Sequence, residues 1–290
     1  MIRDASSADR SAFPAAGPRR WRGLAVAVAA GLSLAGCAAA QSRPAAAGDG
    51  FISLFDGKTL DGWRGDPALW SVRDGAITGH APTRLPQSAF LIRDGSYRDF
   101  ELHFKYRMTE IGNSGFQFRS WVKDEATFSV GGPQANVVPA HQHVRFGMIF
   151  ETLGRLEVAL LSENVEISSV DGKMVRAVKG SVNPVDTLLA TYRPAPGWND
   201  YVVIAYGNRV IHVINGHVAL DAVDNSPQAA REGVFAVQID HQNVPTTIQF
   251  KDIAVKRLTA PPDITGRFIT RPGPPETGPA IPPRPQPPAN

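Results

Sequence analysis

Apolar and polar side chains alternate along the middle of the chain. From residue 100 to residue 108 every second side chain is apolar, and Glu101, His103, Lys105 and Arg107 stand between them. A period of two predicts a β-strand that buries one of its faces.

Three more runs of β-forming residues follow at 201–206, 209–214 and 217–223. Gly207-Asn208 and Asn215-Gly216 separate them, and such pairs tolerate the positive φ that tight hairpins need. The pattern therefore predicts a three-stranded antiparallel meander.

Residues 235–239 and 247–258 are predicted to be the last strands. In the second of them the apolar register shifts, which indicates a β-bulge near Lys251-Asp252. The sequence shows no long amphipathic helical pattern and no alternation of strands with helices. We therefore expect an all-β fold, a single antiparallel β-sandwich domain at residues 51–258.

Residues 1–36 have the pattern of an export signal. Arginines at 19, 20 and 22 precede an apolar stretch at 24–35 that is too short to span a bilayer. The stretch ends in Leu34-Ala35-Gly36-Cys37, which resembles the lipobox of bacterial lipoproteins. We expect cleavage before Cys37 and a lipid on its thiol; a plain secretory peptide with a coincidental cysteine is the alternative.

The residues around the mature domain are predicted to be extended. Ala38 after the cysteine resembles the outer-membrane sorting pattern, so we expect the protein in the cell envelope, at the periplasmic face of the outer membrane. Residues 37–50 read as a small-residue tether. Residues 259–290 hold roughly half of the 24 prolines and are predicted to form a disordered tail.

Composition removes several classes of function. A single cysteine among 290 residues excludes a disulfide within the chain and a multi-cysteine metal site. The net charge of +3 comes from the leader, because five of the 30 basic and two of the 27 acidic residues precede Cys37. The rest of the chain is neutral, so we expect no nucleic-acid partner.

Six motifs in this order resemble the 3-keto-disaccharide hydrolase family, and the resemblance covers nearly all of residues 51–258. They are LFDGKTLDGW at 54–63, WSVRDGAI at 70–77, NSGFQFR at 113–119, WNDY at 198–201, ING at 214–216 and IQFKDI at 248–253. The resemblance implies a concanavalin A-like jelly-roll sandwich that acts on 3-keto sugars or their glycosides. Many members are exported or lipid-anchored, which suits Cys37.

The strand after Gly112 is the first candidate for a binding surface. Strand alternation places Asn113, Gln117 and Arg119 on one face. Planar amides and a guanidinium offer paired donors in fixed directions, which suits sugar hydroxyls and carbonyls. The alternative is a solvated outer face. Trp121, just past this strand, is a candidate for stacking on a sugar, whereas Trp63 and Trp70 are predicted to fill the core.

A second group of candidates lies between residues 134 and 155 and after residue 237. Family members often carry a glutamine and an acidic residue followed by Gly-Arg at places that correspond here to Gln134, Glu151 and Arg155. His141 and His143 allow a metal site but fit a polar surface loop better.

Gln238 and His241 belong to the last candidate strand and its end. Gln238 is predicted to lie opposite the apolar face of its strand. His241 follows the strand beside acidic residues and suits either a proton shuttle or a hydrogen-bonded loop histidine.

The resemblance implies a mechanism for a 3-keto substrate. The C3 carbonyl acidifies the hydrogen on C2, so a base can form an enolate and expel the C1 substituent before water adds. Glu151 or His241 is the expected base or acid, and Arg119 with Gln117, or a divalent metal, is the expected enolate stabiliser. The alternatives are a non-catalytic carbohydrate-binding module and a structural envelope protein that makes contact through its proline tail.

Overall fold

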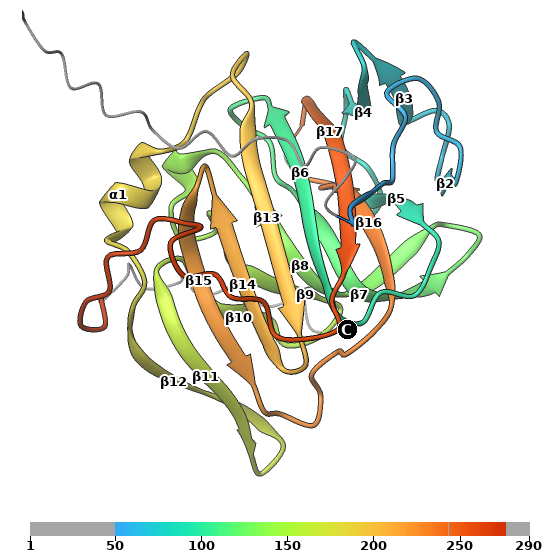
Figure 1. Ribbon diagram of the computed structural model, residues 1–290. Helices are drawn as coiled ribbons and strands as arrows, with labels where there is room; N and C mark the ends of the chain where they lie inside the picture. The colour runs from blue at the N-terminus through green and yellow to red at the C-terminus, as the bar shows by residue number, and fades with distance from the viewer. Residues whose placement is uncertain (1–49, 243, 277–290) are drawn as a thin grey trace, which may run out of the picture. The chain divides into compact units, whose positions relative to one another are not determined.

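The computed structural model describes residues 50–242 and 244–276, which form two β-sheets (Figure 1). In the ten-stranded sheet the order is β12 (Lys173–Ser181), β11 (Glu163–Val170), β15 (His217–Asp224), β14 (Arg209–Ile214), β13 (Asn199–Tyr206), β6 (Phe100–Met108), β17 (Thr246–Arg257), β4 (Ala76–Ala81) and β3 (Trp70–Arg73), with β1 (Ile52–Ser53) on β17. In the seven-stranded sheet the order is β10 (Leu156–Ala159), β9 (Ile149–Thr152), β8 (Ser129–Val137), β7 (Ser114–Asp124), β16 (Val234–Ile239), β5 (Ala89–Arg93) and β2 (Trp63–Arg64). A 3₁₀ turn, η1 (Ala140–Gln142), and a short helix, α1 (Val185–Ala190), lie in connections.

Aromatic side chains from both sheets form the centre of the core. The ring of Phe104 on β6 stacks on Phe116 of β7 with centroids 4.6 Å apart, and Phe250 of β17 lies 5.9 Å from Phe104. Phe235 of β16 packs edge-on against Phe100 of β6 at 5.0 Å. The sheets therefore pack face to face, which confirms the all-β sandwich of the jelly-roll type.

The predicted strands are confirmed with small changes at their ends. β6 and β14 have the predicted bounds, and β13, β14 and β15 form the expected antiparallel meander. The register of β17 against β6 shifts between Lys251 and Ala254, and Asp252 has a φ of +53°. The predicted bulge is therefore present. Trp63 and Trp70 are buried, as expected.

The ends of the domain differ in what the structure describes. The signal peptide, Cys37 and the tether as far as residue 49 lie outside the described residues. Across the described part of the chain, no helix is long and apolar enough to cross a membrane.

Residues 259–276, predicted to be part of a disordered tail, lie along the outer face of the ten-stranded sheet (Figure 1, red). Ile269 exchanges backbone hydrogen bonds with Gly216 and Val218, and Gly273 pairs with Ser181. Ile264 and Phe268 pack on an apolar patch of that face, lined by Val182, Val202, Ile204, Ile211, Val213 and Val218. The expectation of disorder therefore does not describe this segment, because its few apolar residues cover a patch that would otherwise face water.

Candidate functional site

A hollow of about 450 Å³ lies on the outer face of the seven-stranded sheet. On β8, Gln134 and Asn136 alternate with Ala135 and Val137, and the latter two belong to the core. On β16, Gln238 lies between two core residues in the same way. Strand alternation therefore places the polar side chains on the floor of the hollow.

Loops at the strand ends form the walls. One wall comes from the segment that follows β8 and includes η1, and another comes from the segment that follows β16. The lining residues are Ser88, Asn113, Gln134, Asn136, Arg145, Met148, Phe150, Thr152, Gln238, Asp240, His241 and Gln242. The structure thus brings together four of the predicted site residues, Asn113, Gln134, Gln238 and His241.

The floor contains a row of hydrogen-bonded amides. One end of the Gln117 amide lies 2.8 Å from Gln134 Oε1 and 2.7 Å from Thr152 Oγ1, within hydrogen-bond distance of both. Gln134 Nε2 donates to Asn136 Oδ1 at 2.9 Å, and Asn136 Nδ2 donates to the backbone oxygen of Arg145 at 2.8 Å. This continuous series of hydrogen bonds holds each amide in one orientation, so the groups that remain free for a ligand point in fixed directions. Gln117 itself is fully buried beneath this row.

Gly115 makes space for the row. A Cβ at this position would lie 2.2 Å from Cδ of Gln134. The glycine of the Asn-Ser-Gly motif therefore lets the Gln134 side chain lie flat across β7.

An acid and a histidine line the hollow where β16 ends. The side chains of Asp240 and His241 are 14% and 29% exposed, so both are open to solvent. His241 Nδ1 lies 3.3 Å from Ser88 Oγ and 3.8 Å from Asp240 Oδ2. His241 Nε2 lies 2.8 Å from the amide nitrogen of Gln242. Because an amide nitrogen only donates, Nε2 acts as the acceptor and Nδ1 carries the proton toward Ser88 and Asp240.

Two residues of the hollow, Arg145 and Asn113, have polar atoms that contact no partner among the described residues. The exposed guanidinium of Arg145 makes no hydrogen bond or ion pair with the described residues. Asn113 Oδ1 is buried and accepts no hydrogen bond within the same part of the chain. Buried polar atoms are usually satisfied, so an unpaired acceptor beside a cation in a hollow is a candidate ligand contact.

A buried histidine of the core, His212, holds the loop that carries Arg145. His212 Nδ1 lies 2.8 Å from the Tyr201 hydroxyl and 3.1 Å from the backbone oxygen of Gly147. Complete burial lowers the pKa of His212 to about 4, so the ring is neutral at pH 7. A neutral histidine therefore ties this loop to β13 and β14.

Arg119 does not share a face with Gln117, so that prediction is wrong. The register of β7 on β8 shifts between Gln117 and Trp121, and Arg119 has a φ of +49°. This bulge turns the buried Arg119 side chain away from the hollow. Its guanidinium donates to the backbone oxygens of Arg98 (2.6 Å) and Gly207 (2.9 Å) and to Asp99 Oδ1 (3.2 Å).

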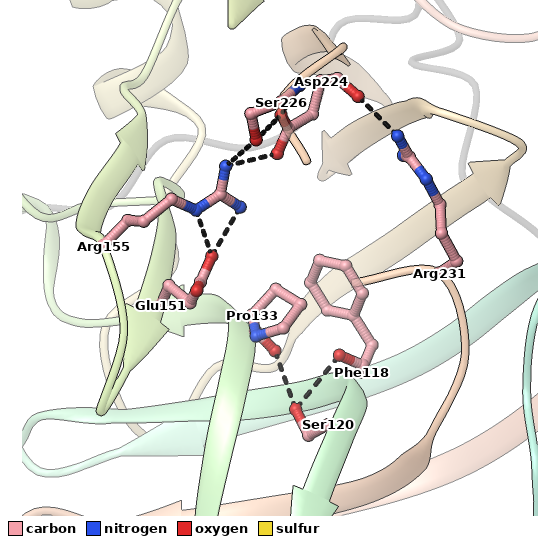
Figure 2. Close-up of polar contacts among 8 residues, drawn as sticks. All are labelled: Phe118, Ser120, Pro133, Glu151, Arg155, Asp224, Ser226 and Arg231. Atoms are coloured by element: carbon pink, nitrogen blue, oxygen red, sulfur yellow. Dashed lines mark hydrogen bonds and ion pairs between the residues drawn. The ribbon is translucent and has the colours of Figure 1, made fainter. Parts of the chain in front are cut away.

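Glu151 and Arg155 also lie outside the residues that line the hollow. On β9, Phe150 and Thr152 point into the hollow, and Glu151 between them points to the opposite side. Figure 2 shows the carboxylate of Glu151 held by the guanidinium of Arg155. Arg145 lies in a turn before β9, so it does not share a strand face with Glu151.

A closed ion-pair cluster surrounds Arg155 (Figure 2). Glu151 Oε2 accepts from Arg155 Nε at 2.7 Å, and Arg155 Nη1 donates to Asp224 Oδ2 at 2.7 Å and Ser226 Oγ at 2.8 Å. Burial lowers the pKa of Arg155, but the hydrogen bonds that it donates to Glu151 and Asp224, together with their negative charge, outweigh this effect and raise the pKa. The cluster links the β9–β10 turn to the end of β15, which is a structural task.

The remaining candidates lie elsewhere. Trp121 is 44% exposed and lies against Gly131, and it does not line the hollow. His141 and His143 are exposed on the loop after β8. Within residues 50–242 and 244–276, no three His, Cys, Asp or Glu side chains form a group that could hold a metal.

Sequence reasoning missed the contributions of Ser88, Met148, Phe150 and Thr152. Thr152 and Phe150 flank Glu151, so the correct face of β9 would have pointed to them. Ser88 precedes β5 in a loop, and no pattern in the sequence relates it to His241.

Comparison with known proteins identifies the family. A family described as 3-keto-alpha-glucoside-1,2-lyase-like domain matches residues 50–256. A 3-keto-disaccharide hydrolase of Bacteroides thetaiotaomicron is 25% identical over 185 residues, which are 60% of this chain and 58% of that protein. The match therefore covers little more than half of that relative's length.

Solved structures with related folds include two bacterial proteins. One is a candidate glycosyl hydrolase from Parabacteroides distasonis, with 18% identity, a TM-score of 0.49, and coverage of 72% of this chain and 94% of that one. The other is the carbohydrate-binding module CBM66 from Bacillus subtilis, with 16% identity, a TM-score of 0.43, and coverage of 67% and 95%. Because the family match extends over well more than half of its residues, this chain belongs to the 3-keto-alpha-glucoside-1,2-lyase-like domains.

Proposed function

We propose that the protein cleaves 3-keto glycosides in the hollow on the seven-stranded sheet, by elimination followed by hydration. One observation carries the proposal: Asp240, His241 and Arg145 line the same solvent-open hollow above a row of amides, and the Arg145 guanidinium has no partner among the described residues. The family and the named relative support the substrate class.

The chemistry needs a base, a stabiliser for the enolate and an acid. The base removes the proton from C2, and the electron pair moves onto the C3 oxygen as the enolate forms. The enolate then re-forms the carbonyl and expels the C1 oxygen, which takes up a proton, and leaves a C1–C2 double bond. Addition of water across this bond, with OH at C1 and H at C2, gives the free 3-keto sugar.

His241 and Asp240 are the proposed proton-transfer groups. In this tautomer Nε2 carries the electron pair, which accepts from the exposed Gln242 amide until a substrate displaces that amide, and Nδ1–H points toward Ser88 and Asp240. Asp240 therefore suits stabilisation of the imidazolium that forms when His241 accepts a proton.

Arg145 is the proposed enolate stabiliser. Its charge is not neutralised by an acidic partner among the described residues, so it can meet charge that develops on the substrate. The amide row and Asn113 suit the sugar hydroxyls. These residues replace Arg119 and Glu151 in the scheme.

The test is release of the aglycone from a 3-keto glycoside by the purified chain, with the unoxidised parent glycoside as the matched control. We expect release from the 3-keto compound alone, with transient absorbance from the unsaturated intermediate. Equal release from the parent glycoside contradicts the elimination. Release with and without a chelator tests whether a divalent cation shares the task of Arg145.

Binding without release favours the second function, a carbohydrate-binding protein. The fixed amide row is the observation behind this alternative, because such a row serves recognition without any proton transfer. Calorimetry with the same 3-keto glycoside separates the two functions.

The proposed location is the periplasmic face of the outer membrane, with a lipid on Cys37. The lipobox sequence before Cys37 supports it. We expect Cys37→Ser to move the protein from the membrane fraction to the soluble fraction; a protein that stays bound contradicts the anchor.

A further inference from the structure

The outer face of the ten-stranded sheet, on the opposite side of the sandwich from the hollow, carries cations around an indole. Arg107 alternates on β6 with the core residues Tyr106 and Met108, so it points outward. Its guanidinium carbon lies 4.6 Å from the ring centre of Trp198, and Lys251 Nζ of β17 lies 4.3 Å from the same ring.

The charge on this cationic face is not balanced. Lys105 and Arg193 share one acid, Asp200, at 2.6 and 3.5 Å. Arg107 donates to a neutral group, Gln249 Oε1, at 2.6 Å.

Two further lysines belong to the cationic face. Lys251 and Lys256 form no ion pair with the described residues. Asp252, which follows Lys251 in the sequence, is the acidic residue next to them. Glu101, further along β6, is neutralised by Arg267 at 2.5 Å. Cations therefore exceed available acids here.

The chain enters the domain at the same face. The ring of Phe51 lies 4.7 Å from the ring of His103, which points outward from β6. Lys256 Nζ lies 5.9 Å from the Phe51 ring centre, and a Cβ on Gly50 would lie 3.5 Å from Lys256 Cε. The described part of the chain therefore begins beside the cationic face.

We propose that the cationic face docks on a surface of anionic phospholipid headgroups. Cations beside such a surface each strengthen binding about fivefold, and tryptophan with its polar N–H favours the headgroup region. Gly50 is 13 residues after Cys37, so a lipid on that cysteine keeps the face within about 45 Å of the bilayer. Docking in this orientation directs the hollow away from the membrane, toward soluble substrate.

A purely structural role for these cations makes a different prediction. Arg107 and Lys251 could serve only to hold Trp198 against the sheet, in which case lipid composition has no influence. The two roles are separated by variants that keep or remove charge at the same positions.

The test measures vesicle binding of the protein from Ala40 to Asn290, which contains both sheets and lacks Cys37. Co-sedimentation is measured with neutral vesicles and with vesicles that contain anionic phospholipid. We expect binding to the anionic vesicles alone, and we expect it to weaken as salt is raised.

Substitutions assign the binding to the cationic face. Arg107→Gln with Lys251→Gln is expected to weaken it about 25-fold, and Arg107→Lys with Lys251→Arg to retain it. Lys173→Gln with Lys179→Gln removes the same charge from β12, at the far edge of the sheet, and is expected to change binding less than twofold.

Three results overturn the proposal: no binding to anionic vesicles, equal binding to neutral ones, or equal loss in the β12 variant. Circular dichroism and Tm confirm that each variant is folded. None of these readouts uses a sugar, so failure here is distinct from failure of the proposed chemistry.

Discussion

β9 contributes to two regions, the hollow and the Arg155 ion-pair cluster, that differ in how completely their polar side chains are paired. Phe150 and Thr152 line the hollow, whereas Glu151 between them enters the Arg155 cluster. In the cluster every charged group has a partner within 2.8 Å. In the hollow, Arg145 and Asn113 Oδ1 have none among the described residues. Complete pairing indicates a structural task, and incomplete pairing beside solvent indicates a ligand.

The comparison corrects a natural assumption about acidic residues. The Glu151 carboxylate is more buried than that of Asp240 in the hollow, and burial alone would favour Glu151 as the catalytic group. Its pairing with Arg155 argues the other way, because the guanidinium holds the carboxylate outside the hollow that Phe150 and Thr152 line.

The largest expected effect is on turnover in the hollow. His241→Gln removes the proposed proton-transfer group and is expected to lower kcat about 10²–10⁴-fold, measured by aglycone release. The Tm is expected to stay close to that of the unchanged protein, because the ring is partly exposed. A variant with normal kcat removes His241 from the mechanism.

The next effect is on stability in the ion-pair cluster. Glu151→Gln leaves the largely buried Arg155 with one of its two acidic partners and is expected to lower the free energy of unfolding by about 3 kcal/mol. Urea unfolding measures this loss, and kcat is expected to change less than about threefold. A stable variant with kcat lowered as in His241→Gln breaks the comparison and returns Glu151 to the mechanism.

A smaller effect concerns the histidine beneath the wall of the hollow. The pKa of His212 is lowered to about 4 by burial, so the unfolded chain binds its proton more readily than the folded chain. The stability from His212 is therefore complete above pH 6.5 and is lost as pH falls toward 4, by at most about 1.4 kcal/mol per pH unit.

Unfolding free energies from pH 7 to pH 4.5 test this expectation against His212→Gln as the reference. We expect the unchanged protein to lose stability more steeply than the variant. Parallel curves show that His212 does not titrate in this range.

The smallest effect concerns the unpaired acceptor. Asn113→Ala removes an oxygen without a partner among the described residues, so KM is expected to rise about 2- to 10-fold with little change in Tm. The matched control is Asn199→Ala, whose amide bonds both the N–H and the C=O of Arg193. That variant is expected to lose stability and keep its KM; the reverse result contradicts the assignment of Asn113.

The sequence predicted the strands better than the site. Alternation in β6 and the two Gly/Asn turns of the meander are local signals, and the structure follows them closely. Even the bulge at Asp252 was visible, since it moves the apolar register of β17.

The bulge at Arg119 left no such trace. Up to that point Phe116 and Phe118 follow the period of two expected of a strand, so the pattern shows no shift. An arginine can occur on either face of a strand, so its identity does not reveal the bulge. Its inward direction depends on the backbone oxygens of Arg98 and Gly207, which are distant in sequence. The meeting of Ser88 with His241 likewise depends on the pairing of β5 with β16.

The segment after β17 bears on where the domain ends. The family match stops at residue 256, yet Leu258, Ile264 and Phe268 cover Val202, Ile204 and neighbouring valines on the sheet. An expression fragment that ends at the family boundary would expose this apolar patch and tend to self-associate. A fragment that extends through residue 276 keeps the patch covered.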